Sequence, residues 1–380
     1  MSEFLLNEIC ELIVDCPHTT AKDEGKGYPL VRTPNIGKGR LVYDGMHRVC
    51  EDVYNKRNAR AIPQENDLIF AREATAGNVA LIQKGEKVCL GQRTVLIRPN
   101  QEKVNPAFLT YFLLAPKQQY NLLSTANGAT VAHVNLPTIR NLKIDLPELS
   151  TQHRIATILS RYDSLIENYQ KQIKLLEEAA QRLYKEWFVD HHFPGHENAK
   201  IVDGVPEGWT PSQLGQLAEF KRGKTITKKD VIDGVIPVVA GGLEPAYYCN
   251  KSNTAERVIT VSGSGANAGF TRMYFEKVWA SDCSFVDTST TPFLHFVYCY
   301  LKDNKTTIDN MQKGAAQPHV YAKDINSLGL CIPIGSVLKS FEGKVSKYFD
   351  SISSLKSQIR LLTEPHDRLL PKLMSGEIEI

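Results

Sequence analysis

The chain has 380 residues, of which 42% are hydrophobic, and this combination predicts two or three globular units and excludes a disordered protein. Eight cysteines without a Cys-x-x-Cys pair, and no apolar run near the roughly 18 residues of a spanning helix, lead us to expect a cytoplasmic protein with reduced thiols and no membrane contact. The net charge of +3, without a strongly basic segment, indicates that nucleic acid is not the ligand or that a partner supplies much of the positive charge.

Residues 1–149 are predicted to form an α+β domain. Short β-prone runs such as YPLVRTP, DLIFA and RTVLIRP are separated by Gly, Pro and Asn, and a helical stretch is expected over 106–124. Asp15 followed by Glu24-Gly25-Lys26 faintly resembles a nuclease pattern. Such a match arises easily by chance, so a nuclease site is not favoured.

A long helix is predicted over residues 150–190. Its apolar side chains follow a strict 4-3 spacing, the period of a coiled-coil seam, at Ile155, Leu159, Tyr162, Ile166, Tyr169, Ile173, Leu176 and Leu183. A linker over 191–208 comes next. It contains His191, His192 and His196 without a fourth ligand at metal spacing, so a solvated connector is favoured over a metal site.

Residues 209–335 are predicted to form a second α+β domain, with strands at RVITV and CSFVD and a helical stretch over 291–311. The run VITVSGSGANAG (258–269) is close to a dinucleotide-binding turn, which must open a helix. Here the β-prone run FTRMYFEKVWA follows instead. A loop between two strands is therefore expected.

A second seam helix is predicted over residues 336–380. Its apolar positions are Phe341, Val345, Tyr348, Ile352, Leu355, Ile359, Leu362 and Leu369. His366 interrupts the pattern, and Pro365 and Pro371 are expected to break the last part of the helix. Because the chain supplies two such stripes, we predict that the two helices pack antiparallel; a homodimeric coiled coil is the alternative.

The chain is duplicated internally. SRYDSLIENYQKQIKLL (160–176) resembles SKYFDSISSLKSQIRLL (346–362), and at the same offset NGATVAHV (127–134) resembles KGAAQPHV (313–320). Gly128 and His133 thus match Gly314 and His319, which we assign to the fold or to the domain–helix joint rather than to sequence reading. The first copy is longer in its interior. The fold class predicted is α+β, with two globular domains separated by two antiparallel helices and related by a pseudo-two-fold axis.

Several enzyme motifs are missing from the sequence, among them a Walker loop, Gly-x-Ser-x-Gly and the Asn/Asp-Pro-Pro-Tyr of amino methylation. This pattern favours a recognition protein over a catalyst. The alternatives that remain open are a coiled-coil scaffold and a standalone DNA-modifying enzyme or nuclease.

The connector LYKEWFVDHHFPGHENAKIVDGVPEGW (183–209) resembles that of the specificity subunits of type I restriction–modification enzymes. DLIFAREATAGNVALI (67–82), CLGQRTVLI (89–97), WASDCSFVD (279–287) and LPKLMSGEI (370–378) resemble other parts of that family. The resemblance implies a non-catalytic subunit whose domains 1–149 and 209–335 are target-recognition domains, each reading half of a bipartite, asymmetric site in double-stranded DNA. It also implies a spacer role for the helices.

The resemblance further implies partners. Two adenine-N6 methyltransferase subunits would dock on the helices, and a restriction/translocase subunit would complete the enzyme. S-adenosylmethionine, ATP and Mg²⁺ would be used by those partners, and no cofactor is expected in this chain. The seam from 155 to 187 spans about 50 Å, so the two half-sites are expected within about 15 base pairs of one another.

Base reading requires polar or basic side chains on loops that reach the grooves, whereas phosphates accept any basic or hydroxyl group. On this basis we predict DNA-contacting residues in both domains, and none that is catalytic or binds a metal. In the first domain they are His18, Thr19, Lys22, Arg32, Asn35, Lys38, Arg40, Arg72 and Arg93. In the second they are Lys221, Arg222, Lys224, Thr225, Ser264, Asn267 and Arg272.

Overall fold

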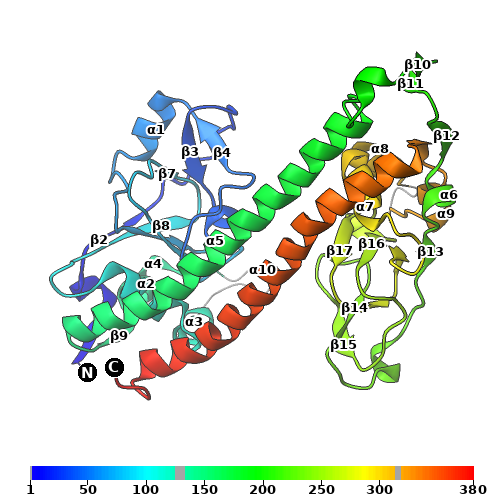
Figure 1. Ribbon diagram of the computed structural model, residues 1–380. Helices are drawn as coiled ribbons and strands as arrows, with labels where there is room; N and C mark the ends of the chain where they lie inside the picture. The colour runs from blue at the N-terminus through cyan, green and yellow to red at the C-terminus, as the bar shows by residue number, and fades with distance from the viewer. Residues whose placement is uncertain (1, 125–132, 313–317) are drawn as a thin grey trace. The chain divides into compact units, whose positions relative to one another are not determined.

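A computed structural model describes residues 2–124, 133–312 and 318–380 (Figure 1). The chain divides into two compact units, which are described separately. Unit 1 consists of residues 1–167 and 359–380, and unit 2 consists of residues 168–358. Each long helix is therefore shared between the two units, whereas the helices predicted over 150–190 and 336–380 were expected to be segments of their own.

Unit 1 contains three sheets. The four-stranded sheet has the order β2-β8-β5-β6, formed by Cys10–Asp15, Thr94–Pro99, Leu68–Ala71 and Val79–Leu81. The three-stranded sheet has the order β4-β3-β7, formed by His47–Val49, Tyr28–Val31 and Cys89–Leu90, with β3 and β7 parallel. A two-stranded sheet pairs β1 (Ser2–Leu5) with β9 (Lys143–Leu146).

The helices of unit 1 are short except for those it shares with unit 2. They are α1 (Glu51–Arg57), α2 (Pro106–Leu114), α3 (Pro116–Ser124) and α4 (Leu136–Arg140), together with short 3-10 turns at Leu6–Glu8 and Thr33–Asn35. The long helices are α5 (Leu149–Phe188) and α10 (Gly335–Ser375). Both ends of the chain lie in unit 1 and close together (Figure 1).

The fully buried strand β5 explains why unit 1 has two cores. Its side chains alternate between the two faces of the sheet, as the pleat of a strand requires. Leu68 and Phe70 pack with α2 and the long helices, whereas Ile69 and Ala71 pack towards β3 and β7. The four-stranded sheet is therefore the middle layer of the unit.

Unit 2 repeats this plan. Its sheets have the orders β13-β19-β16-β17, β15-β14-β18 and β12-β20, the same three sizes as in unit 1. The strands are β12 (Thr210–Gln213), β13 (Lys221–Arg222), β14 (Ile236–Val239), β15 (Tyr247–Cys249), β16 (Val258–Ser262), β17 (Thr271–Tyr274), β18 (Trp279–Ala280), β19 (Cys283–Asp287) and β20 (Gly329–Ile332). A β10-β11 hairpin (Ile201–Val202 and Val205–Pro206) lies in the connector.

The short helices of unit 2 are α6 (Leu214–Leu217), α7 (Leu294–Asp303), α8 (Lys305–Asn310) and α9 (Ala322–Asn326), with 3-10 turns at His196–Asn198, Lys228–Asp230 and Gly265–Asn267. Three of these helices, α7 to α9, match α2 to α4 of unit 1 in order, and α6 takes the place of the 3-10 turn at Leu6–Glu8. The predicted duplication and α+β class are thus confirmed. The extra length of the first copy lies mainly around α1, between β4 and β5, and in the loop between β3 and β4.

The loop predicted at 258–269 is confirmed, because β16 is followed by a single 3-10 turn and then by β17. The connector is more ordered than a solvated linker. Phe193 is 5% exposed and packs against Trp209, with ring centroids 5.3 Å apart, in the main core of unit 2. The apolar residues of the connector anchor it, a role that its polar composition did not indicate.

The two long helices run antiparallel within each unit. In unit 1, Ile155 and Leu159 of α5 share a core with Leu373 and Met374 of α10, and Tyr162 lies beside His366. In unit 2, Trp187 of α5 contacts Phe341 of α10, with ring centroids 5.7 Å apart. Near the other end of that pair, Leu175 and Leu176 line a hollow with Ser351, Ser354 and Leu355.

The predicted seam is buried unevenly. Ile155, Leu159, Phe341, Val345, Ile352 and Leu355 are buried, whereas the other seam residues are half-buried: Tyr162, Ile166, Tyr169, Ile173, Leu176, Leu183, Tyr348, Ile359, Leu362 and Leu369. Several off-seam residues are buried as well, among them Tyr184 and Phe349. The helices bury a wider face than a two-stranded coiled coil does, because they also pack on the globular parts.

The expected break in the second helix is wrong. α10 continues without interruption through Pro365 and Pro371. Beyond the first proline, Leu370, Leu373 and Met374 are buried in the core of unit 1. Burial of these side chains favours a continuous helix and outweighs the local cost of proline, about 3 kcal/mol.

His366 does not leave a gap in the helix pair. Its ring contacts the rings of Tyr111 and Tyr162 edge-on, and its Nε2 lies 3.6 Å from Oδ1 of Asp163. Tyr111 donates a hydrogen bond of 2.5 Å to the other carboxylate oxygen, and burial with this carboxylate raises the pKa of Tyr111. A polar cluster therefore replaces an apolar seam contact in unit 1.

Candidate nucleic-acid interface

In unit 1, the ends of β2, β5 and β8 gather a polar cluster around Arg72. Its Nη1 donates to Oδ2 of Asp15 at 2.7 Å, its Nε donates to the carbonyl of Val134 at 3.0 Å, and its Nη2 lies 2.9 Å from Nε2 of His133. Nδ1 of His133 lies 2.6 Å from Oε1 of Glu73. The guanidinium is thus fixed on three sides and only 9% of the side chain is exposed.

The other oxygen of Glu73 binds Arg93, which precedes β8. Nε of Arg93 lies 2.8 Å from Oε2 of Glu73, yet 60% of the Arg93 side chain is exposed. Arg93 also has a positive φ of 64°, a conformation that costs energy for a residue other than glycine. The loop therefore holds a charged donor towards solvent at the edge of the sheet.

A cavity of about 260 Å³ lies beside this edge in unit 1. It is lined by Thr19, Thr20, Ala21, Leu30, Arg32, Thr33, Pro34, Arg57, Gly91, Gln92 and Arg93. Three guanidinium groups line it without a carboxylate. Arg57 is buried and donates to the carbonyls of Leu90 (2.5 Å), Thr19 (3.0 Å) and Pro17 (3.3 Å), so it fixes the loop after β2. The cavity suits an anionic or acceptor-rich ligand.

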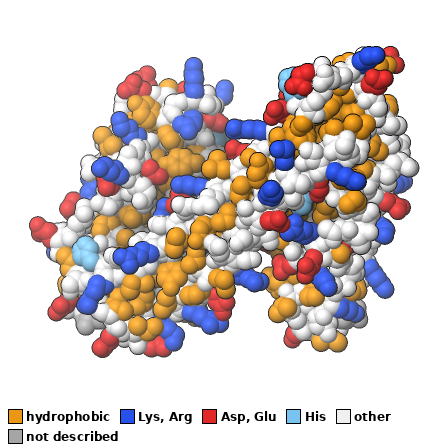
Figure 2. Space-filling model, in the orientation of Figure 1, with side chains coloured by type: hydrophobic (Ala, Val, Ile, Leu, Met, Phe, Trp, Pro, Cys, Tyr) orange, Lys and Arg blue, Asp and Glu red, His pale blue; other side chains and the backbone are white. Residues whose placement is uncertain are grey.

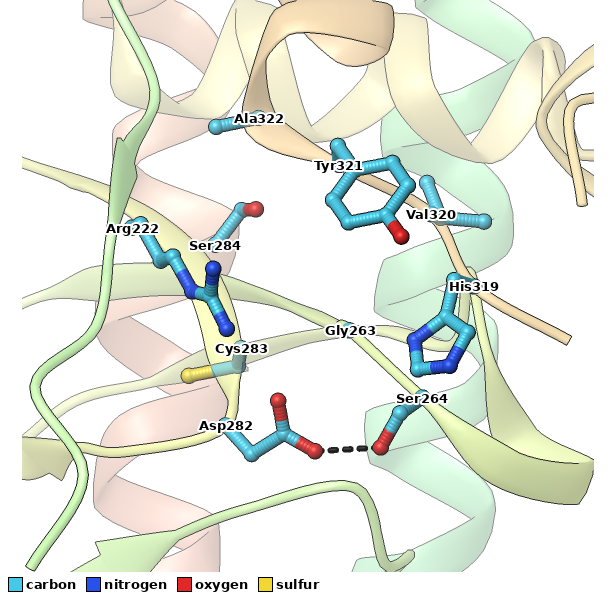
Figure 3. A pocket seen from close by; sticks show the side chains of 10 residues that line it. All are labelled: Arg222, Gly263, Ser264, Asp282, Cys283, Ser284, His319, Val320, Tyr321 and Ala322. Carbon is cyan, nitrogen blue, oxygen red and sulfur yellow. Dashed lines mark hydrogen bonds between the residues drawn. The ribbon is translucent and has the colours of Figure 1, made fainter. Parts of the chain in front are cut away.

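Unit 2 has a cavity of about 320 Å³ at the corresponding edge (Figure 3). It is lined by Arg222, Gly263, Ser264, Asp282, Cys283, Ser284, His319, Val320, Tyr321 and Ala322. The hydroxyl of Ser264 donates to Oδ2 of Asp282. His319 and Tyr321 stack with ring centroids 5.9 Å apart and an angle of 11° between planes.

Backbone register makes the two edges equivalent. Val134 N donates to Arg72 O at 3.0 Å in unit 1, and Val320 N donates to Gly263 O at 3.1 Å in unit 2. Likewise Arg72 N donates to Arg93 O at 2.9 Å, and Gly263 N to Asp282 O at 3.1 Å. The residues that correspond are Asp15 and Arg222, Arg72 and Gly263, Glu73 and Ser264, Arg93 and Asp282, and His133 and His319.

The sign of the charge is reversed at two of these positions. Unit 1 has the carboxylate of Asp15 where unit 2 has the guanidinium of Arg222, and it has Arg93 where unit 2 has Asp282. Equivalent backbone positions therefore present different hydrogen-bonding groups.

Two residues of unit 1 that are predicted to contact DNA have buried side chains, which are hydrogen-bonded within the protein. Asn35 is 1% exposed, and its amide donates to the carbonyl of Val42 at 3.1 Å. Arg72 holds the polar cluster together, as described above.

Arg40 pairs with Glu167 of α5 and is committed to the domain–helix joint. Arg32 donates to the carbonyl of Gly45 at 3.0 Å while lining the basic cavity.

The remaining predicted residues of unit 1 are exposed and stay predictions. They are His18, Thr19, Lys22, Lys38 and Arg93. Nε2 of His18 lies 3.3 Å from Oδ2 of Asp15. The structure brings Thr19, Arg32 and Arg93 together in one cavity, whereas Lys22 and Lys38 do not line it.

In unit 2, Arg222 and Ser264 line the cavity, and Lys221, Lys224 and Thr225 are exposed next to it in sequence. Asn267 is half-buried. Arg272 pairs with Glu244 at 3.1 Å and lies over the rings of Phe270 and Tyr274, so it belongs to a different surface. Asp15, Arg57, Glu73, Gln92 and Asp282 were missed by sequence reasoning.

A catalytic reading of these edges finds little support. Burial raises the pKa of Cys283 in the cavity of unit 2 to about 12, so its thiol is neutral at physiological pH. In the part of the chain that the structure describes, no group of three His, Cys, Asp or Glu side chains could hold a metal ion. Among those same residues, no helix has the length and apolarity to cross a bilayer. Gly128 and Gly314 lie outside the described residues.

Comparison with known proteins identifies the family. The family described as "Type I restriction modification DNA specificity domain" matches residues 1–178 and 206–358. The match covers most of the chain and both copies of the duplication, so the chain belongs to this family. It is a specificity subunit of the type I restriction–modification class and not an enzyme.

Individual relatives match three quarters or more of the chain's length. The MjaIX specificity subunit of Methanocaldococcus jannaschii is 25% identical, over 96% of this chain and 90% of its own. The HindI specificity subunit of Haemophilus influenzae is 22% identical, over 75% and 80%. The crystal structure of the S subunit from M. genitalium has the same fold, with a TM-score of 0.62, 18% identity and coverage of 98% of this chain and 95% of that one.

Proposed function

We propose that the chain reads a bipartite, asymmetric site in double-stranded DNA, with residues 1–149 reading one half-site and residues 209–335 the other. The observation that supports this most is the reversal of charge at equivalent positions, Arg93 against Asp282 and Asp15 against Arg222. Donors and acceptors select different base edges in the major groove. Two copies of one fold that differ in this way would recognise two different sequences.

The long helices serve as the spacer in this proposal. α5 contains 40 residues and α10 contains 41, and in both units the two helices pack on each other. A helix rises about 1.5 Å per residue, so its length limits the separation of the half-sites. The gap between the half-sites would then be a property of the helices and not of the globular domains.

The helices also offer a surface for two methyltransferase subunits. Figure 2 shows hydrophobic side chains over α5 and α10 among scattered charges. Leu165, Leu175 and Leu361 are 45–64% exposed, and a partner that covers them would bury apolar surface. In unit 2, a hollow of about 530 Å³ lies beside Leu175, between the helices.

Those partners would supply what this chain does not. A methyltransferase subunit would bind S-adenosylmethionine and methylate adenine N6, and a restriction/translocase subunit would use ATP and Mg²⁺. The partners would also contribute much of the positive charge around DNA, which fits the net charge of +3. The complex would act in the cytoplasm.

The test is a genome-wide map of N6-methyladenine in cells with and without the gene, by long-read sequencing. The proposal expects one split motif with two unlike halves to lose methylation when the gene is removed. If a methyltransferase subunit reconstituted with the purified chain methylates no motif, the proposal fails. Methylation or cleavage by the chain alone, with S-adenosylmethionine or Mg²⁺, would instead indicate a standalone enzyme.

A further inference from the structure

Arg72 of unit 1 and Gly263 of unit 2 occupy equivalent backbone positions, and the difference between them creates the cavity of unit 2. In unit 1 the guanidinium fills the space between the carboxylate of Asp15, the ring of His133 and the carbonyl of Val134. In unit 2 no side chain leaves that position, and a hollow of about 320 Å³ lies there instead (Figure 3).

The polar groups around this hollow are arranged to accept hydrogen bonds on one side. The hydroxyl of Ser264 donates a hydrogen bond to Oδ2 of Asp282, and this contact orients the carboxylate. The other carboxylate oxygen of Asp282, Oδ1, lies next to Gly263. A Cβ built on that glycine would be 3.2 Å from this oxygen. Asp282 is only half-buried, so this oxygen keeps capacity to accept a hydrogen bond.

Nearby groups favour a planar, hydrogen-bonding ligand. His319 and Tyr321 form a stacked pair along one side of the cavity, and Arg222 faces them across it (Figure 3). A base edge offers a planar ring with an exocyclic donor. Carboxylates accept from the amino group of cytosine N4, and acceptors can equally bind adenine N6, whereas Arg prefers guanine O6 and N7.

We propose that Asp282 is a specificity-determining residue, whose carboxylate accepts a hydrogen bond from the exocyclic amino group of an adenine or cytosine in the second half-site. Arg93, at the equivalent position of unit 1, donates to a guanine in the first half-site. This inference rests on the proposed function and deepens it, because it assigns base chemistry to one position in each half.

The experiment maps the methylated motif of cells that express the full chain with its methyltransferase subunit. Asp282→Ala is expected to relax one position of the second half-site, with a loss of discrimination of roughly ten- to a hundredfold, and to leave the first half-site and the gap unchanged. Asp282→Arg, which copies Arg93, is expected to move that position towards guanine.

The matched control is Glu276→Ala, which removes an exposed carboxylate from the same unit that does not line the cavity. It should leave the motif intact. An unchanged motif in Asp282→Ala overturns the inference while the proposed function stands. No motif with the unsubstituted chain means that the proposed function itself fails.

Loss of all methylation in Asp282→Ala is resolved by a thermal unfolding measurement. If the variant melts like the unsubstituted chain, Asp282 serves affinity in general and the inference is overturned. If it is unfolded, Asp282→Arg decides, because it replaces the acceptor oxygens by donors and carries the residue found at the equivalent backbone position of unit 1. A change confined to one base of the second half-site then supports the inference, and an unchanged motif overturns it.

Discussion

Arg72 illustrates how a residue that resembles a DNA contact can be structural. Its side chain is 9% exposed and its guanidinium is bound to Asp15, so that loss of one partner leaves the charge of the other largely buried and uncompensated. We expect Arg72→Ala to lower the free energy of unfolding by about 3–5 kcal/mol, measured by chemical denaturation. Arg93→Ala is the control: its ion pair is largely exposed, so the loss should stay below about 1 kcal/mol. Equal effects of the two substitutions would contradict the burial argument.

The thiols offer a second prediction. Burial raises the pKa of Cys89 to about 11 and that of Cys283 to about 12, so both remain protonated and unreactive well above neutral pH. Cys50 is exposed. Treatment of the folded chain with a thiol alkylating reagent at pH 8, followed by mass spectrometry, should label Cys50 and spare Cys89 and Cys283. All three should react once the chain is unfolded, and rapid labelling of Cys283 before unfolding would refute the prediction.

At the scale of residues, the sequence identified the loops that line the cavity of unit 1 better than it identified the individual side chains that are exposed there. Thr19, Arg32 and Arg93 do share one cavity. Asn35 and Arg72, chosen by the same reasoning, are buried, because the side-chain type does not reveal which polar group satisfies a neighbouring carbonyl. Asp282 was overlooked because an acidic residue on an edge proposed to face DNA runs against phosphate attraction, and only the alignment of the two backbones makes it a candidate.

Among the elements, α10 invites a direct test of its prolines. Pro365 lies inside a continuous helix, and proline is about 3 kcal/mol less favourable than alanine in a helix interior. Pro365→Ala should therefore raise the free energy of unfolding by roughly 1–3 kcal/mol, as measured by denaturant titration. A loss of stability would show that the proline makes a packing contribution that the backbone cost does not cancel.

The aromatic cluster of unit 2 should dominate the attachment of its helices. Phe341 is fully buried and contacts the rings of Tyr184, Trp187, Phe188 and Phe296. Phe341→Ala is expected to cost about 3–5 kcal/mol of unfolding free energy. Leu175→Ala, at a position 63% exposed, should change it by no more than about 0.5 kcal/mol. A small effect at Phe341 would indicate that the cavity collapses.

The long helices were predictable because their periodicity extends over many turns, which few other patterns imitate. The sheets were predictable only as β-prone runs. Their order depends on contacts between residues far apart in the sequence, such as the parallel pair of β3 and β7. The prediction of a broken α10 failed because a local rule about proline was applied without the burial that overrides it.

For the whole molecule, the spacer proposal predicts the effect of a deletion. Removing one heptad from each helix, residues 168–174 and 352–358, shortens the pair by about 10 Å. This equals at most about three base pairs of DNA. Methylome mapping should show a shorter gap between unchanged half-sites. An unchanged gap would refute the spacer role, and a substitution on the exposed helix face, Leu361→Ala, serves as the control for altered partner docking.

The duplication was the most reliable prediction at this scale. The two long helices and the His-Val pair before each of them align between the copies, so the elements of one copy are expected in the same order in the other. The alignment of the two copies did not predict the reversal of charge between the halves. Such a prediction requires knowing which residues of each copy face the same point, and the insertions around α1 move those residues out of sequence register.

The division of unit 1 into two pieces has a consequence for synthesis on the ribosome. Unit 2 is one uninterrupted stretch, 168–358, and can be completed as soon as that stretch emerges. Unit 1 begins first yet lacks Leu370, Leu373 and Met374, which belong to its core, until residues 359–380 have been translated. Domains generally fold in the order of their synthesis. Here the half that begins first would reach its native packing last, and a chain terminated early would keep a finished second half beside an open first one.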